Sequence, residues 1–434
     1  MTSLTPAAGR SLWHDSRFRR FWLGETLSQF GDRISELALP LIAVVVLDAS
    51  AGQVGLLTAA VWAPNVVSLF VGSWVDQRRQ KRLLLIAADL ARAAVLVTVP
   101  LAYLFEALTL GQLYAVALLT GFGQVLFSTA YPPFFVGLVA RDQFLDANAK
   151  LSASRSASFI AGPAVGGGLV QVVTAPGAIL VDAVTFVVSA VQIGRVRIAE
   201  RPVASTGGQS LLRRSHEGLA LVLRHPFLRA GLGCSTTINF FTFIAQALLI
   251  LFASRTLGLS AGIIGLAFGV GAVGGLVGAV LAPRIAACLG VGPTIALGAV
   301  LFPAPLGFLA LAGGPTWSKA LVLGVVEFVS ALGVMLFDVN LNALQATITP
   351  DAVRSRVSGA YSTINYGVRP LGAVVGGLLG THLGLRPTLV LAGLGGVFSV
   401  LWLVPSPIPA VRSLADVDAP DDAPGHARAD SLSV

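Results

Sequence analysis

Residues 25–36 read ETLSQFGDRISE and are followed by an apolar run from Leu37 to Leu47. The polar positions 25, 29, 32 and 36 are four, three and four residues apart, so on a helix they form one stripe. A charge at the centre of a bilayer costs about 3 kcal/mol on insertion scales. We therefore expect Glu25, Asp32 and Glu36 to face a protein interior or a wet cavity rather than lipid.

The composition indicates an all-α protein that crosses a membrane many times. The chain has 434 residues, of which 55% are hydrophobic and only 12% are charged, whereas soluble domains carry about 25% charge. Its 48 glycines suit helices that pack closely in lipid. The net charge of +8 does not indicate nucleic-acid binding, because the basic residues lie in short pieces between apolar segments. Two cysteines, Cys234 and Cys288, give no disulfide framework.

Runs of about 20 apolar residues are long enough to cross a bilayer, and they predict twelve transmembrane helices. The predicted limits are 19–47, 53–75, 83–105, 111–139, 152–173, 176–196, 227–252, 261–284, 291–312, 317–346, 354–380 and 386–405. We expect an N-terminal six-helix bundle at 1–196, a cytoplasmic central loop at 197–226 and a C-terminal six-helix bundle at 227–405. The remainder, 406–434, is rich in Asp, Ala and Pro and predicts a disordered cytoplasmic tail.

The distribution of Lys and Arg sets the expected orientation, since basic residues gather in cytoplasmic loops. With a cytoplasmic N-terminus, 24 of the 29 basic residues fall on the cytoplasmic side, Arg369 among them, and three fall in outer loops. The other two, Arg33 and Arg92, lie within spans. This asymmetry predicts a multi-pass plasma-membrane protein with both termini in the cytoplasm.

Two sets of landmarks recur about half a chain apart. The end of span two carries Gly72, Asp76 and Arg78, and the end of span eight carries Gly278, Ala282 and Arg284. Asp142, Pro163 and Gly166-Gly167 are matched in order by Asp351, Pro370 and Gly376-Gly377. The pattern predicts two similar six-helix halves that run in parallel.

The loop after span two reads Gly72-x-x-x-Asp76-Gln77-Arg78-Arg79-Gln80-Lys81-Arg82. Glycine lets neighbouring helices approach, and an aspartate among cations at a helix end can pair across the two halves. An ordinary positive-inside loop is the alternative interpretation. The spacing and the degenerate copy at span eight favour a functional loop.

Span five carries Gly162-Pro163-Ala164-Val165-Gly166-Gly167. Proline removes a backbone hydrogen bond and kinks a helix, while the glycines permit tight contact with the opposite half. Generic packing of small residues is the alternative interpretation.

Both motifs resemble those of the major facilitator superfamily. The loop is similar to the family's G-x-x-x-D-R-x-x-R-R/K signature, with Gln77 and Gln80 at two usually basic positions, and residues 162–167 are similar to its antiporter motif G-P-x-x-G-G. Further short matches, in order along residues 15–405, resemble the branch of enterobactin and macrolide exporters, especially actinobacterial members. They are Gly31-Asp32, Leu37-Ala38-Leu39-Pro40, Asp89-x-x-Arg92, Ala147-Asn148-Ala149, Asp182-Ala183-x-Thr185-Phe186, Glu217-Gly218, Arg224-His225-Pro226 and Arg356-Val357.

The resemblance implies a transporter with a substrate site at the midplane between two halves, which rock to give alternating access. It also implies a gating role for both motifs and export as the direction. The chain departs from this branch at Phe337-Asp338, where Tyr-Asn is expected, and span four lacks the membrane arginine of many drug–proton antiporters.

Within the opening stretch, Asp32 is the strongest candidate for a proton-loading acid. It lies twelve residues past Arg20, or about 18 Å along a helix, which is near the middle of a hydrocarbon core about 30 Å thick. Arg33 precedes Glu36 by three residues and can pair with it locally. Glu25 lies nearer the cytoplasm. The alternative is a fixed polar network that locks the first helix to its neighbours.

Other ionisable residues fall inside spans. Glu327 lies near mid-membrane in span ten and is a candidate cavity residue, or else pairs with a polar group of a neighbouring helix. Asp89 and Arg92 are three residues apart in span three and predict a structural ion pair. Asp338 is predicted to serve in gating or structural pairing.

Several classes of site are not indicated. Gly269-x-Gly271-x-x-Gly274 lies inside an apolar helix with no preceding strand, so it indicates helix packing rather than a dinucleotide site. No phosphate loop points to ATP as the fuel, the five histidines show no metal spacing, and no nucleophile and base are arranged for catalysis. We expect no cofactor, no metal and no enzymatic activity.

We therefore predict a monomeric, proton-coupled exporter of lipophilic small molecules, and the cavity acids favour neutral or cationic cargo. An uptake symporter of the same fold and a membrane sensor that binds a ligand without transport are the alternatives.

Overall fold

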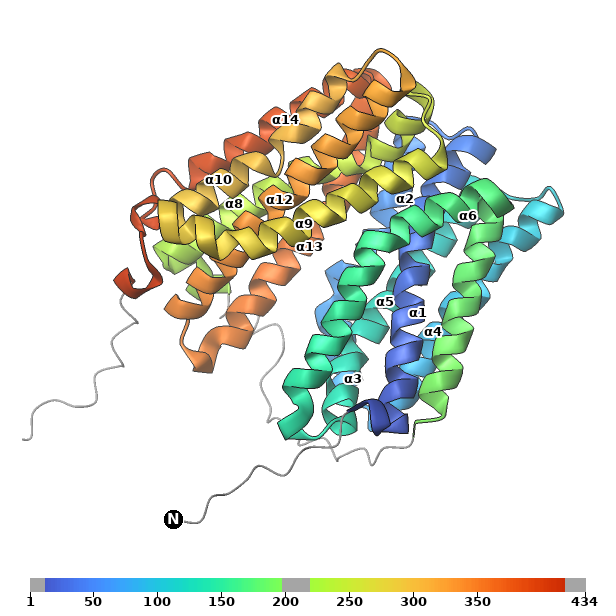
Figure 1. Cartoon of the computed structure of the whole chain (residues 1–434), viewed down its shortest axis with the longest axis horizontal. Coiled ribbons are helices and arrows are strands. Elements are labelled where there is room, and N and C mark those ends of the chain that lie inside the picture. The colour runs from blue at the N-terminus through green and yellow to red at the C-terminus, as the bar shows by residue number, and fades with distance from the viewer. Residues whose placement is uncertain (1–11, 197–218, 418–434) are drawn as a thin grey trace, which may run out of the picture.

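The computed structural model describes residues 12–196 and 219–417 (Figure 1). The described elements are helical, and we refer to α1 to α6 as the N-terminal bundle and to α8 to α14 as the C-terminal bundle. The N-terminal bundle contains α1 (Ser16–Leu41), a π-helix (Ile42–Val46), α2 (Ala51–Trp62), η3 (Ala63–Val67), α3 (Ser68–Asp76), α4 (Lys81–Leu104), α5 (Leu110–Leu138) and α6 (Phe144–Gly194). The C-terminal bundle contains α8 (Pro226–Leu251), a second π-helix (Phe252–Thr256), α9 (Ala261–Leu289), α10 (Val291–Leu301), α11 (Ala304–Phe308), α12 (Thr316–Ile348), α13 (Asp351–His382), α14 (Leu385–Val397) and η7 (Phe398–Trp402).

These elements account for the twelve predicted spans. Eight described helices are long and apolar enough to cross a bilayer, and the bent pair of α2 and α3 makes a ninth. One of the eight, α6, is two helices joined at Thr174, whose φ of 68° breaks the helix between the limits predicted for spans five and six. The remaining two, α1 and α13, are long enough but too polar to pass on composition alone, because α1 carries the acidic stripe and α13 carries polar residues along its length.

The two bundles repeat each other with a constant offset of 210 residues at several landmarks. The first π-helix begins at Ile42, and the second begins 210 residues later at Phe252. Gly166 packs against Ile34 within the N-terminal bundle, and Gly376 packs against Ile244 within the C-terminal bundle. The recurrence of both the motif and its contact confirms the internal repeat and gives a register for comparing the two bundles residue by residue.

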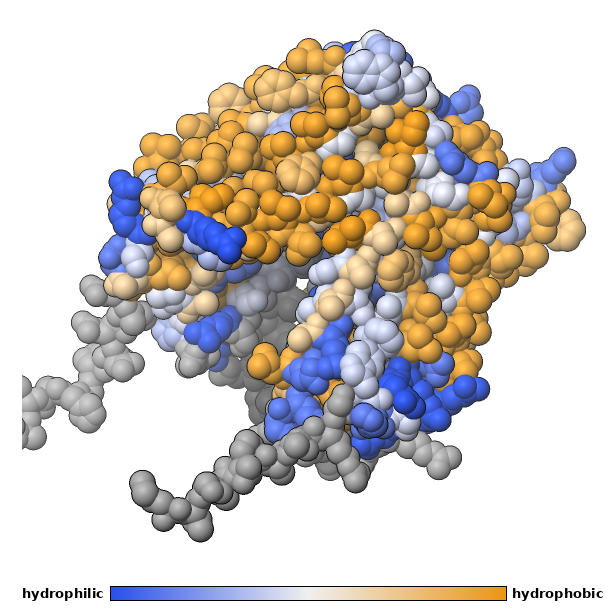
Figure 2. Space-filling view, in the orientation of Figure 1, coloured by the Kyte–Doolittle hydropathy of each residue, from blue (hydrophilic) through white to orange (hydrophobic). Residues whose placement is uncertain are grey.

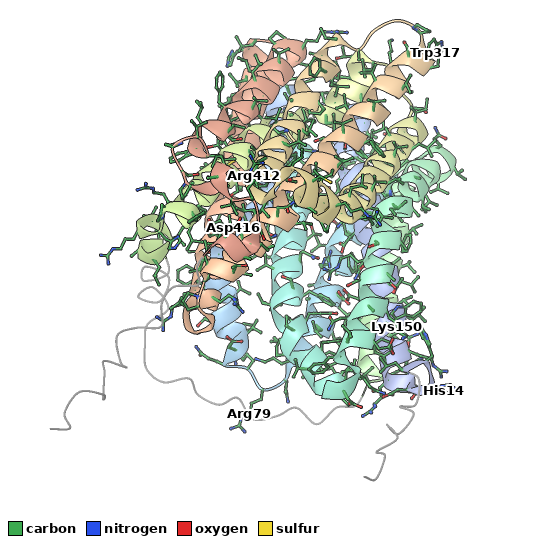
Figure 3. The ribbon with its side chains drawn as sticks, turned by 60° about the vertical axis from the view of Figure 1, so that its left-hand side comes forward. His14, Arg79, Lys150, Trp317, Arg412 and Asp416 are labelled. Carbon is green, nitrogen blue, oxygen red and sulfur yellow. The ribbon has the colours of Figure 1, made fainter. Side chains whose placement is uncertain are left out.

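The bundles meet at one end and diverge at the other (Figure 1). We call these the closed end and the open end. The helices α6 and α9 pack across the interface, as do α2 and α13. Figure 2 shows a hollow between the bundles that widens towards the open end. In Figure 3, His14, Arg79 and Lys150 lie at the open end, and Trp317 lies at the opposite end.

Polar bonds between the bundles gather at the closed end. Arg255 pairs with Asp48, and its guanidinium also donates to the backbone oxygen of Val44. Gln171 donates to Ser260 over 2.9 Å, and Thr381 accepts from the backbone of Gly52 over 3.0 Å. Since all these bonds lie at one end, the structure is one state of a protein whose halves are separated at the other.

The predicted tail is partly wrong. Residues 406–417 are ordered against the start of α10, and Ile408 and Val411 are 0% and 5% exposed. The backbone N–H groups of Val291 and Gly292 donate to Arg412 and Val411. The reason is that apolar residues interrupt this Pro-rich stretch and find a buried site. Residues 418–434 lie outside the described residues, as do 197–218 of the predicted central loop, while 219–224 of that loop are helical.

Candidate functional site

Asp32 lies in the middle of α1 and pairs with Arg92 of α4. The exposed fractions of the two side chains are 23% for Asp32 and 6% for Arg92, so Asp32 is partly accessible and Arg92 is buried. The Arg92 guanidinium also lies over the ring of Phe186 on α6, 3.8 Å from its centroid. The predicted pair of Asp89 with Arg92 is therefore wrong, since a carboxylate 60 residues away competes better than the one on the same helix.

Three more acids are buried around this pair. Asp89 is 0% exposed, and both its carboxylate oxygens lack a hydrogen-bond partner in the described structure. Asp182 is also 0% exposed and accepts from Ser35 and Thr185. Glu25 is 6% exposed and accepts from Gln29 over 2.8 Å. The group thus holds four carboxyl groups around one guanidinium.

The opening stretch contains the predicted local pair, and the long-range pair of Asp32 with Arg92 was not predicted. Arg33 donates to Glu36 over 2.6 Å. This pair is more accessible, with side-chain exposures of 24% and 55%. Arg33 also lies over Phe159 of α6, 4.4 Å from the ring centroid. Glu36 is therefore held by a neighbour, and Asp32 reaches across to another helix.

The two acidic residues of α12 differ in environment. Glu327 packs beside Gly271 of α9, and its Oε1 is buried without a partner in the described region. The glycines of this α9 segment serve packing as predicted, because Gly274 and Gly278 lie against the α12 backbone at Phe328 and Leu332. Asp338 lies eleven residues past Glu327, about three turns nearer the open end, and is exposed.

Arg369 is a residue that the sequence prediction misplaced. It was counted as cytoplasmic, yet it lies well inside α13. Its guanidinium carbon is 4.5 Å from the ring centroid of Trp62, 5.0 Å from Phe243 and 4.4 Å from Tyr366. Its Nε donates to Asn239 over 2.9 Å. Arg369 was counted as cytoplasmic together with Arg354 and Arg356, which lie at the polar start of α13. The signal that could have placed it inside the span is the repeat, in which Arg369 corresponds to Phe159.

The loop after α3 lies at the open end. Asp76 is exposed and makes no hydrogen bond or ion pair in the part of the chain that the structure describes. Lys81 is buried and donates to the Val75 carbonyl, and Arg82 donates to the Val196 carbonyl over 2.8 Å. Arg78 lies over Trp74 at 4.6 Å, and Arg79 is exposed (Figure 3). A Cβ on Gly72 would come no closer than 3.9 Å to Thr129, so the close helix approach expected at Gly72 is not present in this state.

The span-five motif contacts two partners at once. A Cβ on Gly162 would lie 2.6 Å from the Arg33 Cβ, and one on Gly166 would lie 3.1 Å from the Ile34 Cα. Gly167 faces the other bundle, where a Cβ would lie 2.5 Å from the Ala261 carbonyl, and the Pro163 carbonyl lies against Gly265. The predicted tight contact with the opposite half is present, and it lies directly behind the polar stripe of α1.

The family model described as "Major Facilitator Superfamily" matches residues 21–373 and 232–428. The chain belongs to the major facilitator superfamily. As a member of this superfamily it is a multi-pass membrane transporter of small molecules and not an enzyme. Membership favours transport over the alternative of a sensor.

Sequence relatives include a protein called multidrug efflux pump Tap from Mycobacterium tuberculosis, which is 27% identical over 418 residues, covering 90% of this chain and 94% of the relative. An uncharacterised transporter of this superfamily from Bacillus subtilis, YfiS, is 24% identical over 382 residues, covering 85% and 88%.

Solved structures of this superfamily share the fold. A bacterial homologue of the iron transporter ferroportin in an inward-facing state has a TM-score of 0.70 at 17% identity, covering 89% of this chain and 98% of that one. A bacterial homologue of the lysosomal transporter Spinster, inward-facing and unoccupied, has a TM-score of 0.67 at 15% identity, covering 94% and 99%. The nucleoside transporter NupG has a TM-score of 0.66 at 12% identity, covering 89% and 97%.

Proposed function

We propose that this transporter exports lipophilic small molecules in exchange for protons by alternating access. The observation that carries the proposal is the Asp32–Arg92 pair, a partly accessible carboxylate and a buried guanidinium held on two helices and surrounded by buried carboxyl groups. Similarity to a protein named as a multidrug efflux pump supports export of drug-like cargo.

The open end is proposed to face the cytoplasm. With Arg369 assigned to α13, the basic count becomes 23 on that side against three in outer loops, which still favours cytoplasmic termini. An exchanger that faces inwards has released its proton and awaits cargo. The pairing of Asp32 with the Arg92 guanidinium in this state is the arrangement that we propose for a carrier that has released its proton.

Arg92 is proposed to exchange partners during transport. Asp89 lies one turn before Arg92 on α4, so the two can pair along the helix, but here Arg92 is turned to Asp32 and Asp89 has no partner. If Arg92 turns to Asp89 when the outer side opens, Asp32 loses its cation and takes up a proton. The motif at 162–167 is the proposed gate, because it connects the α1 stripe to α9 of the other bundle.

The test compares wild type with Asp32→Asn in everted vesicles, with cargo-dependent proton movement followed by a pH-sensitive dye. We expect Asp32→Asn to abolish proton exchange and drug resistance in a pump-deficient host, with folded protein in the membrane because the unpartnered Asp89, one turn from Arg92, can pair with the guanidinium instead. Glu36→Gln is the matched comparison, since Glu36 is exposed and held by Arg33, and it should retain coupling. Full proton-coupled efflux by Asp32→Asn would reject Asp32 as the coupling acid.

Uptake is the second candidate, because a structurally similar protein is a nucleoside transporter. Intact cells distinguish the two directions. Export predicts that an energised cell expressing the protein holds less of a lipophilic fluorescent dye than a cell without it, whereas greater accumulation would reject export in favour of uptake.

A further inference from the structure

The 210-residue register brings out an exchange of residues between the two bundles. Arg33 on α1 corresponds to Phe243 on α8, and Phe159 on α6 corresponds to Arg369 on α13. Each bundle therefore stacks an arginine on a phenylalanine at the same two positions, with the two residue types exchanged. The distances from guanidinium carbon to ring centroid are 4.4 Å for Arg33 and 5.0 Å for Arg369.

The two arginines differ in their counter-ions. Arg33 is neutralised by Glu36, whose counterpart in the C-terminal bundle is the uncharged Gln246. No carboxylate lies within ion-pair distance of Arg369 in the described parts of the chain. Arg369 is thus a cation inside a span. Unlike Arg33, it has no carboxylate partner in the described parts of the chain.

Neighbouring groups position Arg369 and leave its terminal nitrogens available. The Nε is bonded to Asn239, and the rings of Trp62, Phe243 and Tyr366 surround the guanidinium. Its two terminal nitrogens make no hydrogen bond in the described structure, and they are not among its buried, unpartnered atoms. A fixed guanidinium with two free N–H groups is suited to a planar oxyanion.

The location is consistent with a cargo site. Trp62 belongs to the N-terminal bundle and contacts Phe243 of the C-terminal bundle at 5.2 Å between centroids, so the rings join the two halves. Just beyond them, Ala59, Ala247 and Ala373 form a small buried cluster across the interface. Arg369 therefore lies where the separated part of the two bundles meets the closed part.

We propose that Arg369 binds a carboxylate or similar oxyanion carried by the cargo, whose apolar body lies against Trp62 and Tyr366. This inference rests on the proposed transport function and names its substrate class. It also replaces the expectation of neutral or cationic cargo, because two of the acids behind that expectation are held by arginines: Asp32 by Arg92 and Glu36 by Arg33.

The experiment measures binding to the purified full-length protein in detergent, with empty micelles subtracted. The probes are 1-pyrenebutyric acid and its methyl ester, which share one aromatic body and differ in charge. We expect the wild type to bind the acid more tightly. We expect Arg369→Gln to weaken acid binding by about 10-fold or more, because hydrogen bonds to charged groups are lost, and to leave ester binding unchanged.

Two variants guard against indirect effects. Arg369→Lys keeps the charge without the planar fork and should bind the acid with intermediate affinity. Arg229→Gln removes an exposed arginine of the same bundle and should behave as wild type. Retained ester binding by Arg369→Gln shows that this variant is folded.

Equal binding of acid and ester by the wild type, or unchanged acid binding by Arg369→Gln, would overturn the inference. Loss of ester binding along with the acid would also reject it in favour of a structural role for Arg369. Because binding is measured without a proton gradient, failure of the export proposal remains distinguishable: an acid-selective site in a protein that imports cargo supports this inference and rejects export.

Discussion

Arg92 is the residue on which the buried charges of the N-terminal bundle depend. It lies over Phe186, pairs with Asp32 and is one turn from the unpartnered Asp89. Removing one member of a buried ion pair leaves the other uncompensated, which costs more than the pair contributes. Replacing Arg92 by glutamine tests this dependence, because the glutamine side chain is neutral and close in length to that of arginine.

Arg92→Gln is expected to destabilise the protein by about 3 kcal/mol, the cost of breaking a buried pair, and to lower the midpoint of thermal unfolding in detergent. Adding Asp32→Asn removes the unpaired charge and should recover part of that loss. The control is Arg17→Gln, since the Arg17–Asp15 pair is exposed, with side-chain exposures of 53% and 32%, and such pairs contribute about 0–1 kcal/mol. Equal effects at Arg92 and Arg17 would contradict this account.

The limits of sequence reasoning are clearest for these residues. Arg33–Glu36 was predictable because its spacing brings the side chains together on any helix. The same rule favours Asp89 for Arg92, but Asp32 lies 60 residues away in sequence, and only the packing of α1 near α4 through α6 decides between the two acids. Arg369 was missed because it was counted with the cytoplasmic basic residues, although it lies fifteen residues inside the span predicted at 354–380.

Among the elements, α6 makes the closest contact with the other bundle. Gly167 has no room for a side chain beside Ala261 and Gly262 of α9, whereas a Cβ on the next residue, Gly168, would meet nothing within 4 Å. Substitutions at these two adjacent glycines can therefore be compared. Both change the glycine content of the helix, but only the one at Gly167 disturbs the interface with α9.

Gly167→Leu is expected to force the closed end apart and to shift the population towards the state in which the open end is closed. The measurement is electron–electron distance between spin labels at Gln77 and Ser358, two exposed positions on α3's following loop and on α13, with Cys288 replaced by serine. The inter-label distance should shorten for Gly167→Leu and stay as in wild type for Gly168→Leu. Equal distances in both variants would contradict a role for this contact in holding the state.

The strap of residues 406–417 is a second element whose role can be tested. The composition of residues 406–434 predicted a disordered tail. Composition alone could not show that Ile408 and Val411 fit a buried site at the start of α10. Ile408→Ala is expected to cost about 2–5 kcal/mol, the range for such truncations in a packed core, and to lower the thermal midpoint. Ala410→Ser, at an exposed neighbouring position, should leave the midpoint unchanged. A midpoint equal to wild type for Ile408→Ala would show that the strap does not contribute to stability.

On the scale of the whole molecule, the sequence was most informative about architecture, since twelve hydrophobic runs and a repeated motif are properties of single segments. The arrangement of the bundles was not predictable in the same way, because the sequence must support at least two arrangements of the same helices. The structure is one of them, with its interface bonds at the closed end. Residues that serve the other arrangement are therefore unpartnered here, and Asp76 is the clearest example.

Asp76→Asn is expected to slow transport without weakening cargo binding in the present state. Asp76 is exposed and unpaired in the described structure, so its carboxylate contributes little here, whereas closure of the open end brings the loop after α3 towards α13 and allows a charge-assisted bond. Loss of such a bond, at about 1.5–3 kcal/mol, shifts the equilibrium about 10- to 100-fold towards the open state. Equilibrium binding of 1-pyrenebutyric acid and the distance between labels at Gln77 and Ser358 should be equal to wild type, because the open state already predominates, while flux of the acid into proteoliposomes should fall. Weakened binding with an unchanged distance distribution would instead place Asp76 in the cargo site, because a residue that acts only on the equilibrium between states cannot change affinity in the state that already predominates.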